Sequence, residues 1–220
     1  MDYVLVTFSV LIAAIGIFFT IYFGLKNKEL EKERSKLEEE RSKREKERKT
    51  LTWQDSETAS IDLSKEIKRD FTPDIIFTPD IRGGTIANMI KTYLCDESST
   101  IPVMVGMLVW RDAPDSKSSV PNYFEPFYHI CETRKWHAYV PKEISHHKDK
   151  KILIIDDFVL TGELGSKLKE TLIGEGFKKD SIKFAGVIAT ESAIEGEKPP
   201  DYYWKRINHT VFYFPWGEGK

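Results

Sequence analysis

The segment Lys151-Ile-Leu-Ile-Ile-Asp-Asp-Phe-Val-Leu-Thr-Gly-Glu-Leu-Gly-Ser166 carries the strongest structural signal in the chain. Its apolar start predicts a buried strand that ends in two acids and turns directly into a helix. Backbone N–H groups at such a turn suit a phosphate, and Thr161 adds a hydroxyl donor. Asp156 and Asp157 would lie at the carboxyl edge of a sheet, where they can meet sugar hydroxyls or a hydrated Mg²⁺.

Short apolar runs alternate with amphipathic stretches on both sides of this segment. The alternation is typical of parallel strands joined by helices, so we expect an α/β fold with a doubly wound, mostly parallel sheet, which binds ligands at the carboxyl edge. Residues 111–135 are rich in Pro and Ser and predict a long loop that becomes ordered on demand. The expected strands are 74–77, 101–109, 151–155 and 182–189, and the expected helices are 56–69, 85–94 and 165–176.

The first 50 residues differ in composition from the rest. Residues 3–25 contain no charged side chain and are long enough to cross about 30 Å of hydrocarbon, so we predict a transmembrane helix over 1–25, with a buried core helix as the alternative. Lys26 and Lys28 follow the apolar run, which predicts a single-pass membrane protein whose C-terminal domain is cytoplasmic. Residues 26–50 are almost wholly charged and predict a solvated helical stalk.

Composition supports one folded domain after the stalk. The chain has 220 residues, so residues 51–220 are enough for a single core. A net charge of −2 gives no reason to expect nucleic-acid binding. The two cysteines, Cys95 and Cys131, do not have the spacing of a metal motif and are typical of a reduced, intracellular domain.

Three motifs in this order resemble the type I phosphoribosyltransferases. Asp156-Asp-Phe-Val-Leu-Thr-Gly162 looks like the family's loop for phosphoribosyl pyrophosphate (PRPP), and the segment Thr72–Gly84 resembles its opening segment, which ends in a pyrophosphate-binding Arg-Gly-Gly loop. Pro200–Tyr203 and Phe214–Gly217 resemble the region that closes over the base in xanthine-guanine, hypoxanthine and related purine enzymes. The resemblance spans about residues 51–217 and implies the family's fold with a small C-terminal hood. It also implies that the loop over 111–135 acts as a lid that excludes water.

The resemblance also implies a reaction, a cofactor and a set of site residues. The reaction is the transfer of ribose 5-phosphate from PRPP to a purine-like base with release of pyrophosphate, by a protein that is often a homo-oligomer. Arg82 and Asp157 would be catalytic, Trp216 and Thr190 would bind the base, and Asp156 with Asp157 would hold Mg²⁺, directly or through water. The implied PRPP-binding residues are Ile81, Arg82, Gly83, Gly84, Asp156, Asp157, Phe158, Val159, Leu160, Thr161, Gly162, Glu163 and Leu164.

Three positions depart from the family pattern. Leu160 stands where purine enzymes usually carry a proton-accepting acid, Leu164 stands where the family favours Thr or Ser, and Thr190 stands near the place of a base-contacting Lys. A leucine cannot transfer a proton, and losing a positioned base commonly costs on the order of 10² to 10⁴ in rate. Two hypotheses therefore stay open: an active phosphoribosyltransferase, and a sensor or effector at the membrane that binds PRPP or a nucleotide without turnover.

The motifs also have purely structural interpretations. Arg82 could be an exposed charge in a turn, and Asp156-Asp157 could cap the following helix without a ligand. Trp216 could belong to the core together with the neighbouring aromatic residues, which are Phe212, Tyr213 and Phe214.

Overall fold

The chain divides into two units, residues 1–48 and 49–220. In the first unit, residues 22–24, 26–28 and 30–38 are helical. The structure is a computed structural model, and it describes residues 22–24, 26–28, 30–38, 50–96, 99–111, 126–208 and 212–219.

The localisation predicted from the sequence, a single-pass membrane protein with a cytoplasmic domain, has to be corrected. None of the helices within the described ranges combines the length and the apolar character that crossing a bilayer requires. The predicted span, residues 3–25, lies outside the described residues apart from 22–24. Residues 39–49 of the predicted stalk also lie outside them, so the division of the chain into anchor, stalk and domain stays a prediction.

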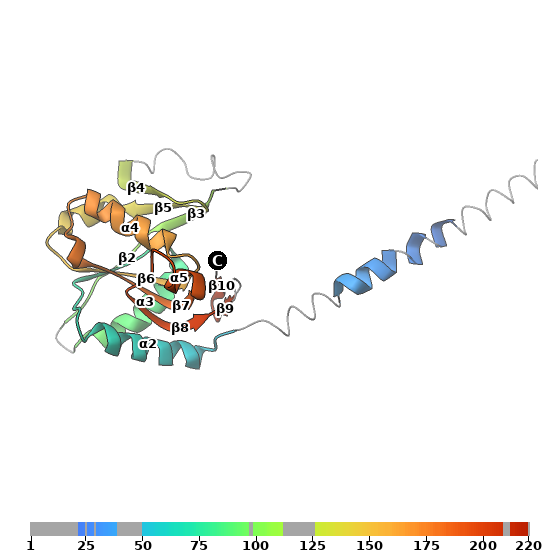
Figure 1. Cartoon of the computed structure of the whole chain (residues 1–220), viewed down its shortest axis with the longest axis horizontal. Helices are drawn as coiled ribbons and strands as arrows, with labels where there is room; N and C mark the ends of the chain where they lie inside the picture. The colour runs from blue at the N-terminus through green and yellow to red at the C-terminus, as the bar shows by residue number, and fades with distance from the viewer. Residues whose placement is uncertain are drawn as a thin grey trace, which may run out of the picture. The chain divides into compact units, whose positions relative to one another are not determined.

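A five-stranded parallel sheet forms the centre of the 49–220 unit (Figure 1). The strand order is β2-β1-β6-β7-β8, which confirms the predicted α/β fold with a mostly parallel sheet. Long apolar runs such as Ile152 to Ile155 are wholly buried, as expected for strands that are covered on both faces. The strands are β1 (Ile75–Thr78), β2 (Val103–Val105), β6 (Ile152–Val159), β7 (Ile182–Thr190) and β8 (Tyr202–Ile207).

Helices cover the two faces of this sheet. On one face, Leu153 and Ile155 of β6 belong to the apolar cluster that also includes residues of α2 and α3. On the other face, Ile152 and Ile154 pack in a second cluster with residues of α4. The helices are α2 (Trp53–Ile67), α3 (Ile81–Leu94), α4 (Glu163–Gly174) and α5 (Glu191–Ile194), with 3₁₀ segments η2 (Lys142–His147) and η3 (Lys179–Ser181).

A second, three-stranded antiparallel sheet has the order β3-β5-β4, with β3 (Met107–Trp110), β4 (Tyr128–Glu132) and β5 (Trp136–Pro141). The single strand expected over 101–109 is therefore wrong, because Gly106 separates β2 from β3. A Cβ atom at Gly106 would lie 2.7 Å from the carbonyl oxygen of Tyr139, so glycine alone fits this close approach. The expected loop over 111–135 is also wrong in its last part, where β4 forms; residues 112–125, and with them the lid prediction, lie outside the described residues.

The C-terminal segment forms a two-stranded antiparallel sheet of β9 (Phe212–Phe214) and β10 (Gly217–Gly219). Tyr213 accepts a hydrogen bond from the backbone N–H of Leu51 at 2.9 Å, which ties this hairpin to the start of α2. The predicted C-terminal hood falls on these residues, and its closure over a ligand stays a prediction.

Candidate functional site

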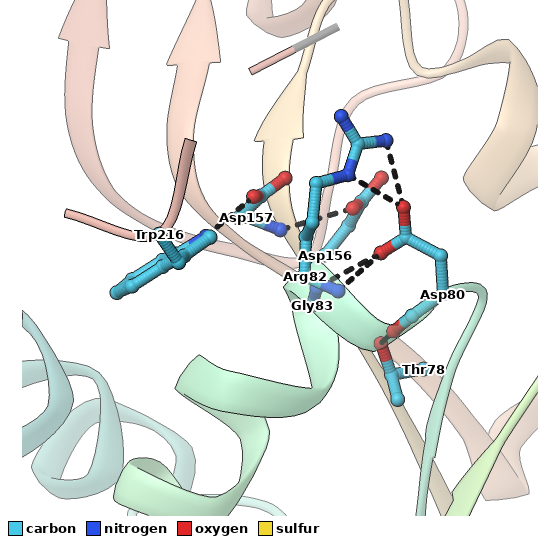
Figure 2. A network of polar contacts seen from close by, with 7 residues as sticks. All are labelled: Thr78, Asp80, Arg82, Gly83, Asp156, Asp157 and Trp216. Carbon is cyan, nitrogen blue, oxygen red and sulfur yellow. Dashed lines mark hydrogen bonds and ion pairs between the residues drawn. The ribbon is translucent and has the colours of Figure 1, made fainter. Parts of the chain in front are cut away.

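The sheet order reverses direction between β1 and β6. From β1 the chain proceeds outward to β2, whereas from β6 it proceeds the other way to β7 and β8. In open α/β sheets such a reversal leaves a crevice at the carboxyl ends of the two strands, and ligands bind there. The segment from Thr78 to Gly84 follows β1, and Asp156 and Asp157 belong to β6, so two motifs that are about 70 residues apart meet at this edge (Figure 2).

Asp80 organises the residues that follow β1. Its Oδ1 accepts hydrogen bonds from the backbone N–H groups of Arg82 and Gly83, both at 2.9 Å, and so caps the N-terminus of α3. Its Oδ2 lies 2.8 Å from Nε and 2.7 Å from Nη2 of Arg82 (Figure 2). The predicted Arg-Gly-Gly loop is therefore the first turn of a helix, and an acid from its own chain engages its donors.

Gly83 allows α3 to start directly against the sheet. A Cβ atom at this position would lie 2.3 Å from Oγ1 of Thr78 and 3.1 Å from the carbonyl oxygen of Ile155. Gly84 has more space, because the atoms nearest to an added Cβ lie 3.8 and 3.9 Å away. Ile81, the first residue of α3, is 79% exposed. The close approach at Gly83 brings Arg82 next to the acids of β6.

Asp156 and Asp157 are buried within β6, which continues to Val159 instead of ending at the acids as predicted. The longer strand is explained by Phe158 and Val159, which pair with Ile188 and Ala189 of β7. The backbone N–H of Asp157 donates to Oδ1 of Asp156 at 3.0 Å.

Burial sets the electrostatics of this acid pair. It raises the pKa of Asp156 well above its ordinary value, and the charges of Asp157 and Asp80 raise it further. Burial also raises the pKa of Asp157 to about 6, against a hydrogen bond from Trp216 that lowers it. Burial alone would lower the pKa of Arg82, but the charges of Asp80, Asp157 and Asp156 outweigh it and raise that pKa. Burial therefore favours the protonated form of Asp156, whereas Asp157, with a pKa of about 6, is mostly ionised at neutral pH, and both acids lie beside the cation of Arg82.

Trp216 reaches the acid pair from the C-terminal hairpin. Its Nε1 donates a hydrogen bond to Oδ2 of Asp157 at 2.9 Å (Figure 2). The ring of Phe214 stacks on Trp216 at 5.2 Å between centroids and 17° between planes, and the half-exposed Trp53 lies at 5.7 Å in a tilted arrangement. The indole is thus packed between aromatic side chains and joined to the site through its N–H.

Hydroxyl groups at the end of β7 and in α5 fix the turn that follows β6. The carbonyl oxygen of Leu160 accepts hydrogen bonds from the hydroxyls of Thr190 at 2.5 Å and Ser192 at 3.0 Å. Gly162 adopts the left-handed conformation with φ 71°, and a Cβ there would also overlap the carbonyl oxygen of Lys198. The side chain of Thr161 is exposed at the tip of the turn. These contacts fix the turn that leads into α4.

A cavity of about 360 Å³ adjoins this turn. The turn between β4 and β5 closes one side of it, and the backbone N–H of Arg134 donates to Oε1 of Glu163 at 2.9 Å. The basic residues Arg134, Lys135 and Lys198 line the cavity and are exposed. Sequence reasoning missed them, because the turn Thr133-Arg134-Lys135 contains none of the Gly, Pro, Asn, Asp or Ser residues that usually indicate a hairpin.

The predicted site residues separate into groups. Arg82, Gly83, Asp156, Asp157 and Trp216 form one network, and Thr161, Gly162 and Glu163 lie at the turn and cavity. The side chains of Phe158 and Val159 are buried, whereas those of Leu160 and Leu164 are half-buried and pack against the apolar clusters at the edge of the cavity. Thr190 is buried, and its hydroxyl donates a hydrogen bond to the carbonyl oxygen of Leu160 and not to a member of the Asp157 network. Sequence reasoning also missed Asp80, whose position just before Ile81 is an N-cap signal.

The acid pair can hold a metal ion only with help from a ligand. In the part of the chain that the structure describes, three or more His, Cys, Asp or Glu side chains nowhere converge to form a metal site. Mg²⁺ commonly uses one or two carboxylates together with substrate oxygens and water. Asp156 and Asp157 fit that requirement, because a nearby cation would offset the cost of their buried charge.

These features describe an α/β domain with a candidate ligand site at a sheet reversal. The chain belongs to the phosphoribosyl transferase domain family, whose model matches residues 49–219. This confirms the resemblance to the phosphoribosyltransferases.

Comparison with solved structures shows the same fold. A purine phosphoribosyltransferase from Pyrococcus horikoshii has a TM-score of 0.54 at 22% identity and covers 79% of this chain and 96% of its own. A hypothetical protein from Neisseria gonorrhoeae with bound ppGpp has a TM-score of 0.54 at 17% identity, and the match covers 77% of this chain and 89% of that protein. The xanthine-guanine-hypoxanthine phosphoribosyltransferase of Helicobacter pylori has a TM-score of 0.50 at 14% identity, and the match covers 77% of this chain and 94% of that enzyme. Among curated proteins, none matches this sequence.

Proposed function

We propose that this chain is a phosphoribosyltransferase that transfers ribose 5-phosphate from PRPP to a purine-like base and releases pyrophosphate. The observation that supports this most directly is the convergence of three parts at one sheet edge: Arg82 at the start of α3, the acid pair of β6, and the turn at 160–162. Those parts match the pyrophosphate, the ribose and the 5-phosphate of PRPP in kind, since the first is cationic, the second accepts hydroxyl donors, and the third offers N–H groups.

The 5-phosphate would bind at the turn. Thr161 and Gly162 present a hydroxyl and backbone N–H groups next to the cavity, and Lys198 with Arg134 supplies positive charge at its rim. The ribose hydroxyls would bind Asp156 and Asp157, which are separated from that turn by Phe158 and Val159 of β6. The pyrophosphate would lie at Arg82, whose guanidinium sits beside both acids (Figure 2).

Mg²⁺ would be held by Asp156 and Asp157, directly or through water, together with oxygens of PRPP. When bound, it neutralises charge on the pyrophosphate. Its presence would also favour ionisation of Asp156, whose pKa burial raises well above its ordinary value.

The reaction breaks the bond between C1 of ribose and the pyrophosphate oxygen, which leaves with the electron pair. A lone pair on the base nitrogen forms the new bond to C1, and the nitrogen loses its proton. Leu160 cannot take that proton. Asp157 is the better candidate, because its pKa of about 6 lies close to the operating pH, which is favourable for a general base. Arg82 would stabilise the departing pyrophosphate electrostatically.

A purine base is favoured by the named activity of two structural neighbours, and Trp216 is our candidate for contacting it. The indole edge lies at Asp157, so a base that receives C1 nearby would approach the Trp216 and Trp53 rings. Thr190 is a weaker candidate than predicted, since its hydroxyl is already bonded to Leu160.

Nucleotide formation tests this proposal. The full chain would be incubated with PRPP, Mg²⁺ and hypoxanthine, guanine, xanthine or adenine, and the products separated chromatographically. We expect a nucleoside monophosphate from at least one base, reduced at least 100-fold in Asp157→Asn. Asp180→Asn, which removes an exposed acid in η3, should retain full activity. Absence of product with every base, in a folded protein that binds PRPP, would refute transferase activity.

A second candidate is a sensor or effector domain that binds PRPP or a nucleotide without turnover. The observation that favours it is Leu160, whose side chain packs against the core where a proton acceptor is expected. One structural neighbour with bound ppGpp shows that the fold can accommodate a nucleotide. Tight, Mg²⁺-dependent PRPP binding with no pyrophosphate release would support this candidate over the first.

A further inference from the structure

We infer that Asp80 is an internal occupant of the pyrophosphate subsite and sets the preference of this chain between ligands with and without a pyrophosphate group. The inference rests on the proposed function, because it assigns the start of α3 to pyrophosphate. It concerns Asp80, which was not among the site residues predicted from the sequence.

The geometry around Asp80 is that of a bound anion. One carboxylate oxygen receives the N–H groups of Arg82 and Gly83, both at 2.9 Å. The other receives Nε and Nη2 of Arg82 at 2.8 and 2.7 Å. Two backbone donors and a guanidinium fork are the groups that bind phosphate oxygens at helix N-termini. A pyrophosphate that uses these donors must therefore displace Asp80.

The surrounding negative charges disfavour an incoming pyrophosphate that competes with Asp80 for these donors. Asp80 is largely buried, with 13% of its side chain exposed, and its charge raises the pKa values of Asp156 and Asp157. An incoming pyrophosphate would meet three carboxylates and the single guanidinium of Arg82 in the network drawn in Figure 2. Displacing Asp80 without neutralising it would leave that carboxylate among like charges.

The 5-phosphate turn does not depend on this exchange. Thr161 is exposed and lines a cavity of about 360 Å³ with Lys198 at its rim, and neither Asp80 nor a residue of α3 is among the residues that line this cavity. Ribose 5-phosphate or a nucleoside monophosphate can therefore bind while Asp80 stays on Arg82. The chain should favour these ligands more than a site with free α3 donors would, and PRPP should bind only at the cost of breaking the Asp80–Arg82 contacts.

Substitution of Asp80 by Asn separates the charge from the helix cap. Asn caps helices about as well as Asp, so the N–H groups of Arg82 and Gly83 keep an acceptor while the anionic competitor is lost. Isothermal titration of the full chain with inorganic pyrophosphate, PRPP and ribose 5-phosphate in Mg²⁺ would give the three dissociation constants. We expect pyrophosphate and PRPP to bind about tenfold more tightly in Asp80→Asn. Ribose 5-phosphate should change less than twofold.

Asp180→Asn is the matched control, because it removes an exposed acid of the same chemistry from η3 and should alter none of the three constants. Asp80→Ser, which also caps helices, provides a second variant if Asp80→Asn fails to fold. Unchanged or weaker pyrophosphate binding in these variants, with ribose 5-phosphate binding intact, would overturn the inference alone. Failure of the wild-type chain to bind any of the three ligands would overturn the proposed function as well.

Discussion

The indole N–H of Trp216 donates a hydrogen bond to Oδ2 of Asp157 at 2.9 Å, across 59 positions of the chain. It connects the C-terminal hairpin to the central strand β6, and it is the strongest influence that lowers the pKa of an acid which burial raises to about 6. The last residues of the chain therefore take part in the electrostatics of the site.

Trp216→Phe tests whether this hydrogen bond matters more than stacking. The substitution keeps an aromatic ring against Phe214 but removes the donor, so we expect the pKa of Asp157 to rise further. Loss of a hydrogen bond to a charged group is worth roughly 1.5 kcal/mol or more, so the acid limb of the rate profile should move up by about one pH unit. An unchanged acid limb with a raised KM for the base would instead support a stacking role.

Asp157→Asn should make the protein more stable at neutral pH while abolishing its function. A carboxyl whose folded pKa lies above its ordinary value of 3.8 favours the folded state below that value, and the advantage is lost as pH rises to about 6. A shift of about two units corresponds to roughly 3 kcal/mol. Thermal unfolding in EDTA should show the variant melting several degrees higher than wild type at pH 7.5, with little difference at pH 4. A lower melting temperature at pH 7.5 would contradict this account of the site.

Gly83→Ala and Gly84→Ala should differ although the residues are adjacent. An added methyl group at Gly83 overlaps Thr78, so we expect a loss of about 1 to 3 kcal/mol in the free energy of unfolding and weaker PRPP binding. At Gly84 the space is sufficient, and alanine in a helix should be neutral or stabilising by up to about 1 kcal/mol. Denaturant unfolding compares the two variants directly. Equal effects would show that α3 does not approach the sheet as closely as described.

Thr190→Val tests whether Thr190 anchors the turn or contacts the base. Valine has nearly the same shape but leaves the Leu160 carbonyl with Ser192 as its hydroxyl partner among those described. We expect a loss of about 1 kcal/mol in stability and a severalfold weaker affinity for ribose 5-phosphate, with Thr190→Ser as the control that keeps the hydroxyl. If only the KM for the base rises, the base-binding prediction is the correct one.

Much of the central sheet could be predicted because its strands are continuous apolar runs bounded by turn residues. Residues 74–77 and 182–189 were placed within a residue of β1 and β7. The helix over 85–94 was predicted in the right place but begins earlier, at Ile81. The helix begins earlier because the side chain of Asp80 caps its N-terminus, whereas the family motif predicts a loop at Arg82-Gly83-Gly84.

The antiparallel sheet of β3, β5 and β4 was not predictable in the same way. One apolar run is divided at Gly106 between β2 of the central sheet and β3 of this one, and the Pro- and Ser-rich composition of 111–135 indicates a loop although β4 begins at Tyr128. The contacts of Asp80 with Arg82, of Trp216 with Asp157 and of Thr190 with Leu160 depend on which residues the fold brings together. The motif identified most of the site residues, but not what each side chain contacts.

Equilibrium binding of PRPP tests the central claim most directly, because both the transferase and the sensor require it. Isothermal titration of the full chain with PRPP in Mg²⁺ should give a saturable, one-site isotherm. Affinity should fall at least tenfold in Gly162→Ala, which places a side chain against Lys198 at a left-handed position, while Asp180→Asn should bind like wild type. An absence of PRPP binding by the folded wild-type chain, or equal binding in Gly162→Ala, would contradict the assignment of this sheet edge as a ribose phosphate site.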